Sequence, residues 1–161
     1  MQFKLVGAKN LKAMVANFDW SGKTILIAED DYYSSAYLRE LFSRTGATII
    51  HVDNGLRAFA ECLKNPEINL VLMDVKLPIV NGLESTRLIK KYKPHIKVIA
   101  QTAFAMVGDR NRCLSAGCDE YITKPIDPAD LFSKIYRLFT YQDLSAEASE
   151  QIIANKNDHP H

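Results

Sequence analysis

Short apolar runs alternate with longer amphipathic segments from Lys23 onward. The first, third and fourth runs are rich in Ile, Val and Leu without alternating polar positions, which is typical of strands covered on both faces. Runs of this kind separated by helical patterns indicate a parallel sheet flanked by helices. The predicted strands are Thr24–Ala28, Thr48–Val52, Leu70–Met73, Lys97–Gln101 and Glu120–Thr123.

The segments between these runs have helical spacing and recognisable ends. In the first, Leu38, Leu41 and Phe42 form one apolar stripe, and Gly46 follows it as a terminator. The second has Asn54 as its N-cap. Its apolar positions are Leu56, Phe59, Ala60 and Leu63. The predicted helices run roughly over Tyr32–Thr45, from Asn54 to before Asn65-Pro66, and over Leu83–Tyr92, Val107–Ala116 and Pro128–Phe139.

Five such units predict one α/β domain. We expect a flavodoxin-like, doubly wound five-stranded parallel sheet in the order 2-1-3-4-5, with helices on both faces. A chain of 161 residues is long enough for one such domain with tails. Residues 23–140 form the predicted domain, residues 1–22 a linker or the end of an upstream domain, and residues 141–161 a tail. The tail is expected to be partly helical, over Ala146–Ala154, or disordered.

Composition narrows the function only slightly. An apolar share of 47%, a charged share of 24% and a formal charge of +1 are ordinary for a soluble globular protein. They give no reason to expect nucleic acid or an anionic membrane as partner. No apolar run approaches the ~20 residues that span a bilayer, and the start lacks a signal-peptide core, so we expect a cytoplasmic protein. Cys62, Cys113 and Cys118 include no CxxC pair, which favours free thiols in a reducing compartment.

Acidic residues follow two of the predicted strands. Glu29, Asp30 and Asp31 come directly after the first strand, and Asp74 comes directly after the third. In a flavodoxin-like sheet these strands are neighbours, so the acids should converge. Three carboxylates within about 4 Å would repel by roughly 4 kcal/mol per pair at an effective dielectric of about 20. Either a pKa rises sharply or a hard cation binds, and open carboxylate sites suit Mg²⁺.

The same residues also have simpler interpretations. Asp30 or Asp31 could cap the first helix, although capping does not explain Asp74. Lys124 could be a solvated charge, or it could pair with Asp74, particularly if a cis Lys124–Pro125 bond aims it inward. The Thr102 hydroxyl could satisfy a turn or donate to a phosphate oxygen. Tyr121, at the start of the fifth strand, could be a half-buried strand aromatic.

Four motifs taken together have a family resemblance. The segments ILIAEDD, LVLMDVKLPIVNG, VIAQTA and YITKP resemble the receiver domains of bacterial response regulators and hybrid histidine kinases. The likeness covers about residues 23–139, with the motifs in the right order at successive strand ends. It implies a domain that accepts a phosphoryl group from a phosphohistidine and changes conformation, catalysing its own phosphorylation and dephosphorylation.

The resemblance implies a role for each matching residue. Asp74 would be the phosphoacceptor, and Lys124 the lysine that pairs with it. The implied Mg²⁺ ligands are Asp30, Asp74, the main-chain carbonyl of Lys76 and, through water, Glu29. The implied switch residues are Thr102 and Tyr121. Pro78 and Gly82 match the loop beyond the acceptor, and Asp31 falls at a capping position.

The implied partners are a histidine kinase or a histidine phosphotransfer domain. No nucleic acid partner and no membrane segment is expected within this chain. A homodimer would use the face of the fourth helix, fifth strand and fifth helix. The segment FDWSGK resembles connectors that precede receivers in hybrid kinases, so we favour that origin.

Lys76 and Phe104 occupy variable positions, each two residues after a motif residue. We hypothesise that these long or bulky side chains hinder a hydrolytic water and prolong the life of the phosphoryl group. Rival readings remain: a haloacid-dehalogenase-type hydrolase would want an acid where Lys76 stands. A flavin-binding module would want a glycine- and hydroxyl-rich loop after the first strand, and a receiver that takes no phosphate is the third alternative.

Overall fold

The computed structural model describes residues 15, 17–104 and 106–157. Most of the predicted linker, residues 1–14 and 16, and the last four residues of the predicted tail lie outside this part. Five parallel strands form one sheet in the order β2-β1-β3-β4-β5, which confirms the predicted fold. The strands are β1 Thr24–Ala28, β2 Thr48–Val52, β3 Ile68–Asp74, β4 Lys97–Thr102 and β5 Glu120–Thr123.

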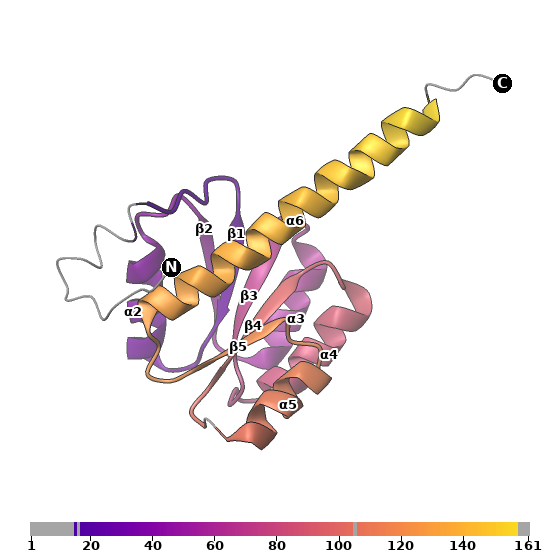
Figure 1. Ribbon diagram of the computed structural model, residues 1–161. Helices are drawn as coiled ribbons and strands as arrows, with labels where there is room; N and C mark the ends of the chain where they lie inside the picture. The colour runs from indigo at the N-terminus through magenta and orange to yellow at the C-terminus, as the bar shows by residue number, and fades with distance from the viewer. Residues whose placement is uncertain (1–14, 16, 105, 158–161) are drawn as a thin grey trace.

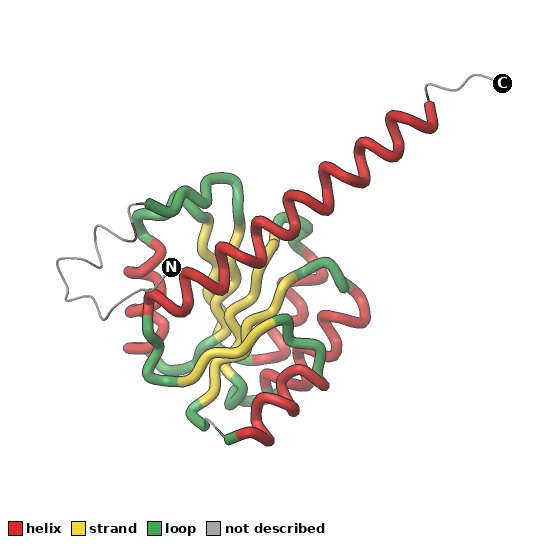
Figure 2. The backbone as a smooth tube through the Cα atoms, viewed as in Figure 1, coloured by secondary structure: helices red, strands yellow, loops and turns green. Residues whose placement is uncertain are grey.

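Helices cover both faces of the sheet (Figures 1 and 2). The described helices are α2 Tyr32–Phe42, α3 Gly55–Lys64, α4 Gly82–Tyr92, α5 Val107–Ser115 and α6 Pro128–Asn157. Buried side chains of α2 and α6 pack on one face, and those of α3, α4 and α5 pack on the other. Side-chain caps start three of these helices, since Asp31, Asn54 and Asn81 each accept a backbone N–H from the first turn.

The last helix is longer than predicted. We expected it to end at Phe139, but α6 continues to Asn157 and projects away from the domain (Figure 1). Residues 140–157 contain neither Gly nor Pro, so the sequence has no helix terminator there. Two side chains also hold this segment against the sheet: Asp143 pairs with Lys23, and the Gln142 amide donates to the His95 carbonyl.

Several of the apolar positions of α3 do not face the core. Leu56 and Leu63 are 49% and 42% exposed, and Ala60 is exposed. The residues that face the core are the small Gly55, Ala58 and Cys62. The reason is a close approach: a Cβ on Gly55 would lie only 1.9 Å from the Val80 carbonyl oxygen. Phe59 is half-buried at the edge, beside Tyr92.

The core extends to a residue before the expected domain start. The sequence places Trp20 in the segment 1–22, before the predicted domain, yet Trp20 is only 4% exposed. Its ring lies 4.9–5.9 Å from four phenylalanine rings, those of Phe18, Phe42, Phe132 and Phe139. Its backbone N–H donates to the Thr45 carbonyl. Trp20 therefore joins the start of β1 to α2 and α6.

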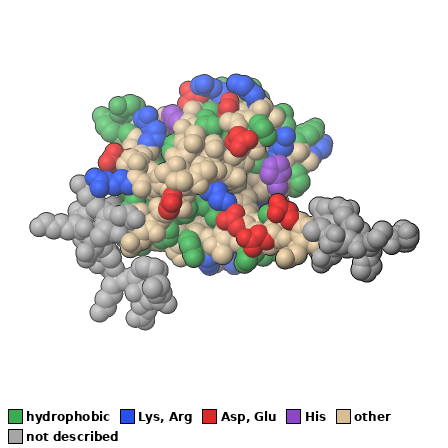
Figure 3. Space-filling view, turned by 90° about the horizontal axis from the view of Figure 1, so that it is seen from above, with side chains coloured by type: hydrophobic (Ala, Val, Ile, Leu, Met, Phe, Trp, Pro, Cys, Tyr) green, Lys and Arg blue, Asp and Glu red, His purple; other side chains and the backbone are tan. Residues whose placement is uncertain are grey.

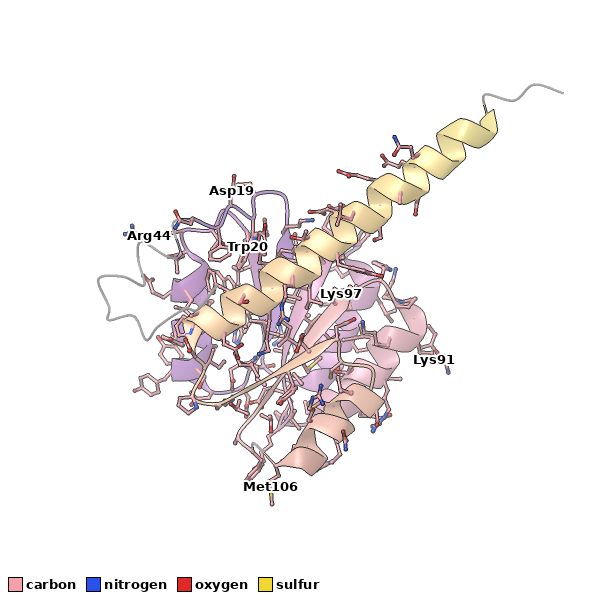
Figure 4. The ribbon with its side chains drawn as sticks, viewed as in Figure 1. Asp19, Trp20, Arg44, Lys91, Lys97 and Met106 are labelled. Carbon is pink, nitrogen blue, oxygen red and sulfur yellow. The ribbon has the colours of Figure 1, made fainter. Side chains whose placement is uncertain are left out.

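The two ends of the sheet differ in character. Asp19 and Trp20 lie at the end where β1 begins, and Met106 lies at the opposite end, beyond β4 (Figure 4). Seen from the Asp19 end, Lys, Arg, Asp and Glu side chains are interspersed (Figure 3). The acids that follow β1 and β3 lie at the other end. Among the described residues, no helix is long and apolar enough to cross a membrane.

Replacing Trp20 with alanine should destabilise the domain by about 3–5 kcal/mol, because the ring is buried among four others. Urea denaturation followed by circular dichroism would measure the free energy of unfolding. Tyr32→Ala is the control, since Tyr32 is exposed and should change stability by less than about 0.5 kcal/mol. An equal, small effect in both variants would show that the segment before β1 is not part of the core.

Candidate functional site

Three carboxylates meet at the carboxyl ends of two neighbouring strands. Glu29 and Asp30 follow β1 directly, Asp74 ends β3, and Ala28 of β1 pairs with Met73 of β3. One carboxylate oxygen from each of the three acids lies within 4.8 Å of the others. Glu29 and Asp74 are buried, and Asp30 is exposed. The parallel sheet thus brings together acids that are 45 residues apart in sequence, at the edge where such sheets bind ligands.

Lys124 reaches the same cluster from the end of β5. Its Nζ donates to Glu29 Oε2 at 2.8 Å and to Asp74 Oδ2 at 3.1 Å. The Lys124–Pro125 bond is cis. The backbone N–H of Lys124 donates to the Thr102 carbonyl, which ties the start of this turn to β4. One ammonium is therefore shared by two carboxylates.

The charges in this cluster do not balance. Burial raises the pKa of Glu29, and hydrogen bonds from Lys124 and from the Asp31 backbone only partly oppose it. Burial alone would lower the pKa of Lys124, but its hydrogen bonds to Glu29 and Asp74 outweigh burial and raise it. Lys124 therefore stays protonated at neutral pH, and three carboxylates face one ammonium. Such a set of hard oxygen donors with excess negative charge fits Mg²⁺.

Asp31, the acid next to Asp30, caps a helix and is not part of the cluster. Asp31 is the N-cap of α2, and its Oδ1 accepts the Ser34 backbone N–H at 2.7 Å. That hydrogen bond is also the main reason why the pKa of Asp31 lies below its usual value. The capping interpretation therefore applies to Asp31 and leaves Asp30 available to the acid cluster.

The loop after β3 closes tightly over Asp74. Asp74 Oδ1 accepts the Lys76 backbone N–H at 3.0 Å, and the Gly82 N–H donates to the Val75 carbonyl. A Cβ on Gly82 would lie 2.0 Å from the Asp74 carbonyl oxygen, so no side chain fits at this position. Ile79 adopts a left-handed backbone conformation with φ 69°, which is rare for a β-branched residue. Nothing in the sequence around Ile79 predicts this backbone conformation.

Thr102 and Tyr121 lie on adjacent strands beside the acids. Thr102 is buried, and its Oγ1 accepts the Phe104 backbone N–H at 3.2 Å. This hydroxyl therefore satisfies a turn, as the simpler interpretation had it. Tyr121 is half-buried and packs against the core on the α3–α5 face. Its pairing partner on β4 is Ala100, two residues before Thr102.

A cavity of about 340 Å³ opens beside Asp74. Thr102 and Lys124 line it with Asp74, and Lys76 Nζ lies 4.5 Å from the centre of the Phe104 ring at its rim. Asp109 and Arg112 of α5 also line it, 3.7 Å apart. Nothing in the sequence marks Asp109 and Arg112 as site residues, because opposite charges three positions apart are common on the surface of helices.

A metal-free domain should depend on Lys124 for stability. Lys124→Met leaves the buried Glu29 carboxylate without its cation, and we expect a loss of roughly 1–3 kcal/mol in unfolding free energy. Urea denaturation in the presence of EDTA would measure it. The control is Arg87→Met, which removes an exposed pair with Glu84 and should cost about 0–1 kcal/mol. Equal losses would contradict the burial argument.

Comparison with known proteins identifies the class. The family model for the response regulator receiver domain matches residues 25–136, and the chain belongs to this family. The chain is 42% identical over 106 residues to the polar-differentiation response regulator DivK of Brucella anthropi, covering 65% of this chain and 85% of that protein. It is 35% identical over 141 residues to hybrid signal transduction histidine kinase I of Dictyostelium discoideum. That match covers 83% of this chain but only 8% of the kinase.

Solved structures agree with this placement. The receiver domain of sensor histidine kinase PA1611 from Pseudomonas aeruginosa is 30% identical, with a TM-score of 0.67 over 73% of this chain and 98% of that one. That structure has a magnesium ion coordinated in its active site cleft. A CheY-like receiver domain protein from Methanospirillum hungatei is 31% identical, with a TM-score of 0.71 over 76% of this chain and 98% of that one. The predicted family is confirmed.

Proposed function

We propose that this receiver domain accepts a phosphoryl group on Asp74 in a Mg²⁺-dependent reaction. Asp30, Asp74 and the Lys76 carbonyl would ligate the ion directly, and Glu29 would do so through water. The observation that carries this proposal is the meeting of the Glu29, Asp30 and Asp74 carboxylates within 4.8 Å, with Lys124 bonded to two of them. Further support comes from the magnesium ion in the PA1611 receiver.

The reaction exchanges one bond to phosphorus for another. An Asp74 carboxylate oxygen attacks the phosphorus of a phosphohistidine and forms an acyl phosphate. The bond from phosphorus to the donor nitrogen breaks, and its electron pair stays on the imidazole, which takes up a proton. Bound Mg²⁺ would neutralise charge on the phosphoryl oxygens. Lys124 is hydrogen-bonded to Asp74 and can donate instead to a phosphoryl oxygen once the acyl phosphate has formed.

Thr102 and Tyr121 would couple the phosphoryl group on Asp74 to a conformational change at the surface. The Thr102 hydroxyl lines the cavity beside Asp74 and can leave its turn partner to donate to a phosphoryl oxygen. Its movement would give the half-buried Tyr121 room to rotate inward. Such a change shifts a pre-existing equilibrium between two conformations.

The proposed partners are a histidine kinase or a histidine phosphotransfer domain. The family and the kinase relative support this class of donor. A homodimer through the face of α5, β5 and α6 is proposed as the response, because Tyr121 on β5 belongs to that face. Residues 1–22 are proposed to connect the domain to an upstream segment, with Trp20 packed in the core.

Incubation of the protein with acetyl phosphate and Mg²⁺ should add the mass of one phosphoryl group, measured by intact mass spectrometry. Asp74→Asn should abolish the gain, and EDTA should suppress it, because the nucleophile or the cation is then missing. Asp31→Asn is the matched control, since Asp31 is a neighbouring acid that caps α2. A mass gain that persists in Asp74→Asn would refute the assignment of the acceptor.

The lifetime of the phosphoryl group should depend on Lys76 and Phe104. Their side chains lie against each other at the rim of the cavity beside Asp74, where they can hinder a water molecule. Lys76→Asn and Phe104→Ala should each accelerate phosphoryl loss by several-fold, measured by intact mass after removal of acetyl phosphate. Arg110→Ala, an exposed residue of α5, is the control. Unchanged rates in both test variants would remove the idea.

A further inference from the structure

Gln101 is a buried polar residue with an unpaired side chain. It lies on β4, directly before Thr102, and its side chain is 0% exposed. Neither amide atom, Nε2 or Oε1, has a hydrogen-bond partner within the described residues. A buried amide without partners destabilises a folded chain relative to an apolar residue of similar size. A buried polar group without a partner therefore points to a functional site, because folded proteins tolerate such a cost mainly where function requires it.

Gln101 also lines a cavity of about 380 Å³, which we name the Gln101 cavity. It is lined by residues of α2 and of the connection from β5 to α6. Figure 1 shows that this connection runs toward the α2 side of the sheet. The other lining residues are Tyr33, Ser34, Tyr37, Leu38, Lys124, Pro125 and Ile126. Lys124 lines both this cavity and the one beside Asp74, but Asp74 and Thr102 line only the latter. The volume is in the range of small-molecule sites.

The chemistry of the lining favours a neutral ligand. Lys124 is the one charged residue that lines the cavity, and its ammonium is already bonded to Glu29 and Asp74. The other lining residues are apolar or aromatic except Ser34, and the Gln101 amide offers one donor and one acceptor group side by side. A glutamine amide pairs through two hydrogen bonds with a partner that presents the opposite order, as on the edge of a nucleobase.

We propose that the Gln101 cavity binds a small, neutral, planar molecule with an adjacent donor and acceptor on one edge, such as a nucleobase or an aromatic carboxamide. Gln101 pairs with that edge, and Tyr33 and Tyr37 contact the ring. Both amide atoms are buried, so a lining side chain must move for a ligand to reach them. Tyr33, 80% exposed, has the freedom to do so. This inference does not rest on phosphorylation of Asp74.

Nuclear magnetic resonance titration of the full chain with adenine and with nicotinamide tests the site. Toluene is the comparison probe, because it lacks the donor–acceptor edge. In the wild type, both test probes should shift backbone amide resonances of Tyr33, Tyr37 and Ile126 in a saturable way. Gln101→Leu should weaken the binding of adenine and nicotinamide at least about tenfold, because the variant lacks the amide that hydrogen-bonds to these probes. Toluene makes no such hydrogen bonds, so its binding should not change. Gln151→Leu, on an exposed part of α6, is the matched control.

The absence of saturable shifts with both test probes, or equal binding by the wild type and Gln101→Leu, would overturn the proposal. Thermal unfolding without ligand gives a second readout. Gln101→Leu should raise the melting temperature if the amide is unpaired in the free protein, and a lower value would contradict the premise. Gln101→Met keeps the length of the side chain and repeats both comparisons if the leucine variant does not fold.

Discussion

Crowding of like charge at one edge of the sheet is the constraint on which the site depends. Parallel strands β1 and β3 bring Glu29, Asp30 and Asp74 together, and Lys124 is the one cation among the described residues that is bonded to this cluster. Burial makes this repulsion stronger than it would be in water. The fold holds the acids there through the register of β1 with β3 and the core packed around these strands. This excess negative charge is the property on which the proposed binding of a divalent cation rests.

The surrounding structure serves this arrangement. Gly82 lets the loop after β3 pass against the Asp74 carbonyl, and Asp31 starts α2 without drawing Asp30 out of the cluster. Two cavities flank Lys124, one beside Asp74 and one beside Gln101. A single lysine thus lies between the proposed site of chemistry and a proposed site of recognition. Lys124 lines both cavities and is hydrogen-bonded to Asp74.

Much of this could be predicted from the sequence, because short runs such as Thr24–Ala28 are buried on both faces and strand ends in such sheets converge. The sequence is less informative where tertiary packing decides. Which residues of α3 face the core depends on the close approach of Gly55 to Val80, and the burial of Trp20 depends on rings far away in sequence. The length of α6 depended on contacts of Gln142 and Asp143. The sequence could not single out Gln101, because the lack of hydrogen-bond partners for its amide is visible only in the folded structure.

The central claim is that the acid cluster holds a divalent cation. Isothermal titration calorimetry of Mg²⁺ into the wild type, Asp30→Asn and Asp31→Asn tests it most directly, because the two aspartates are adjacent in sequence but only Asp30 belongs to the cluster. The account predicts saturable binding to the wild type and to Asp31→Asn, and strongly weakened binding to Asp30→Asn. Equal heats in all three proteins, or no binding to any, would contradict it.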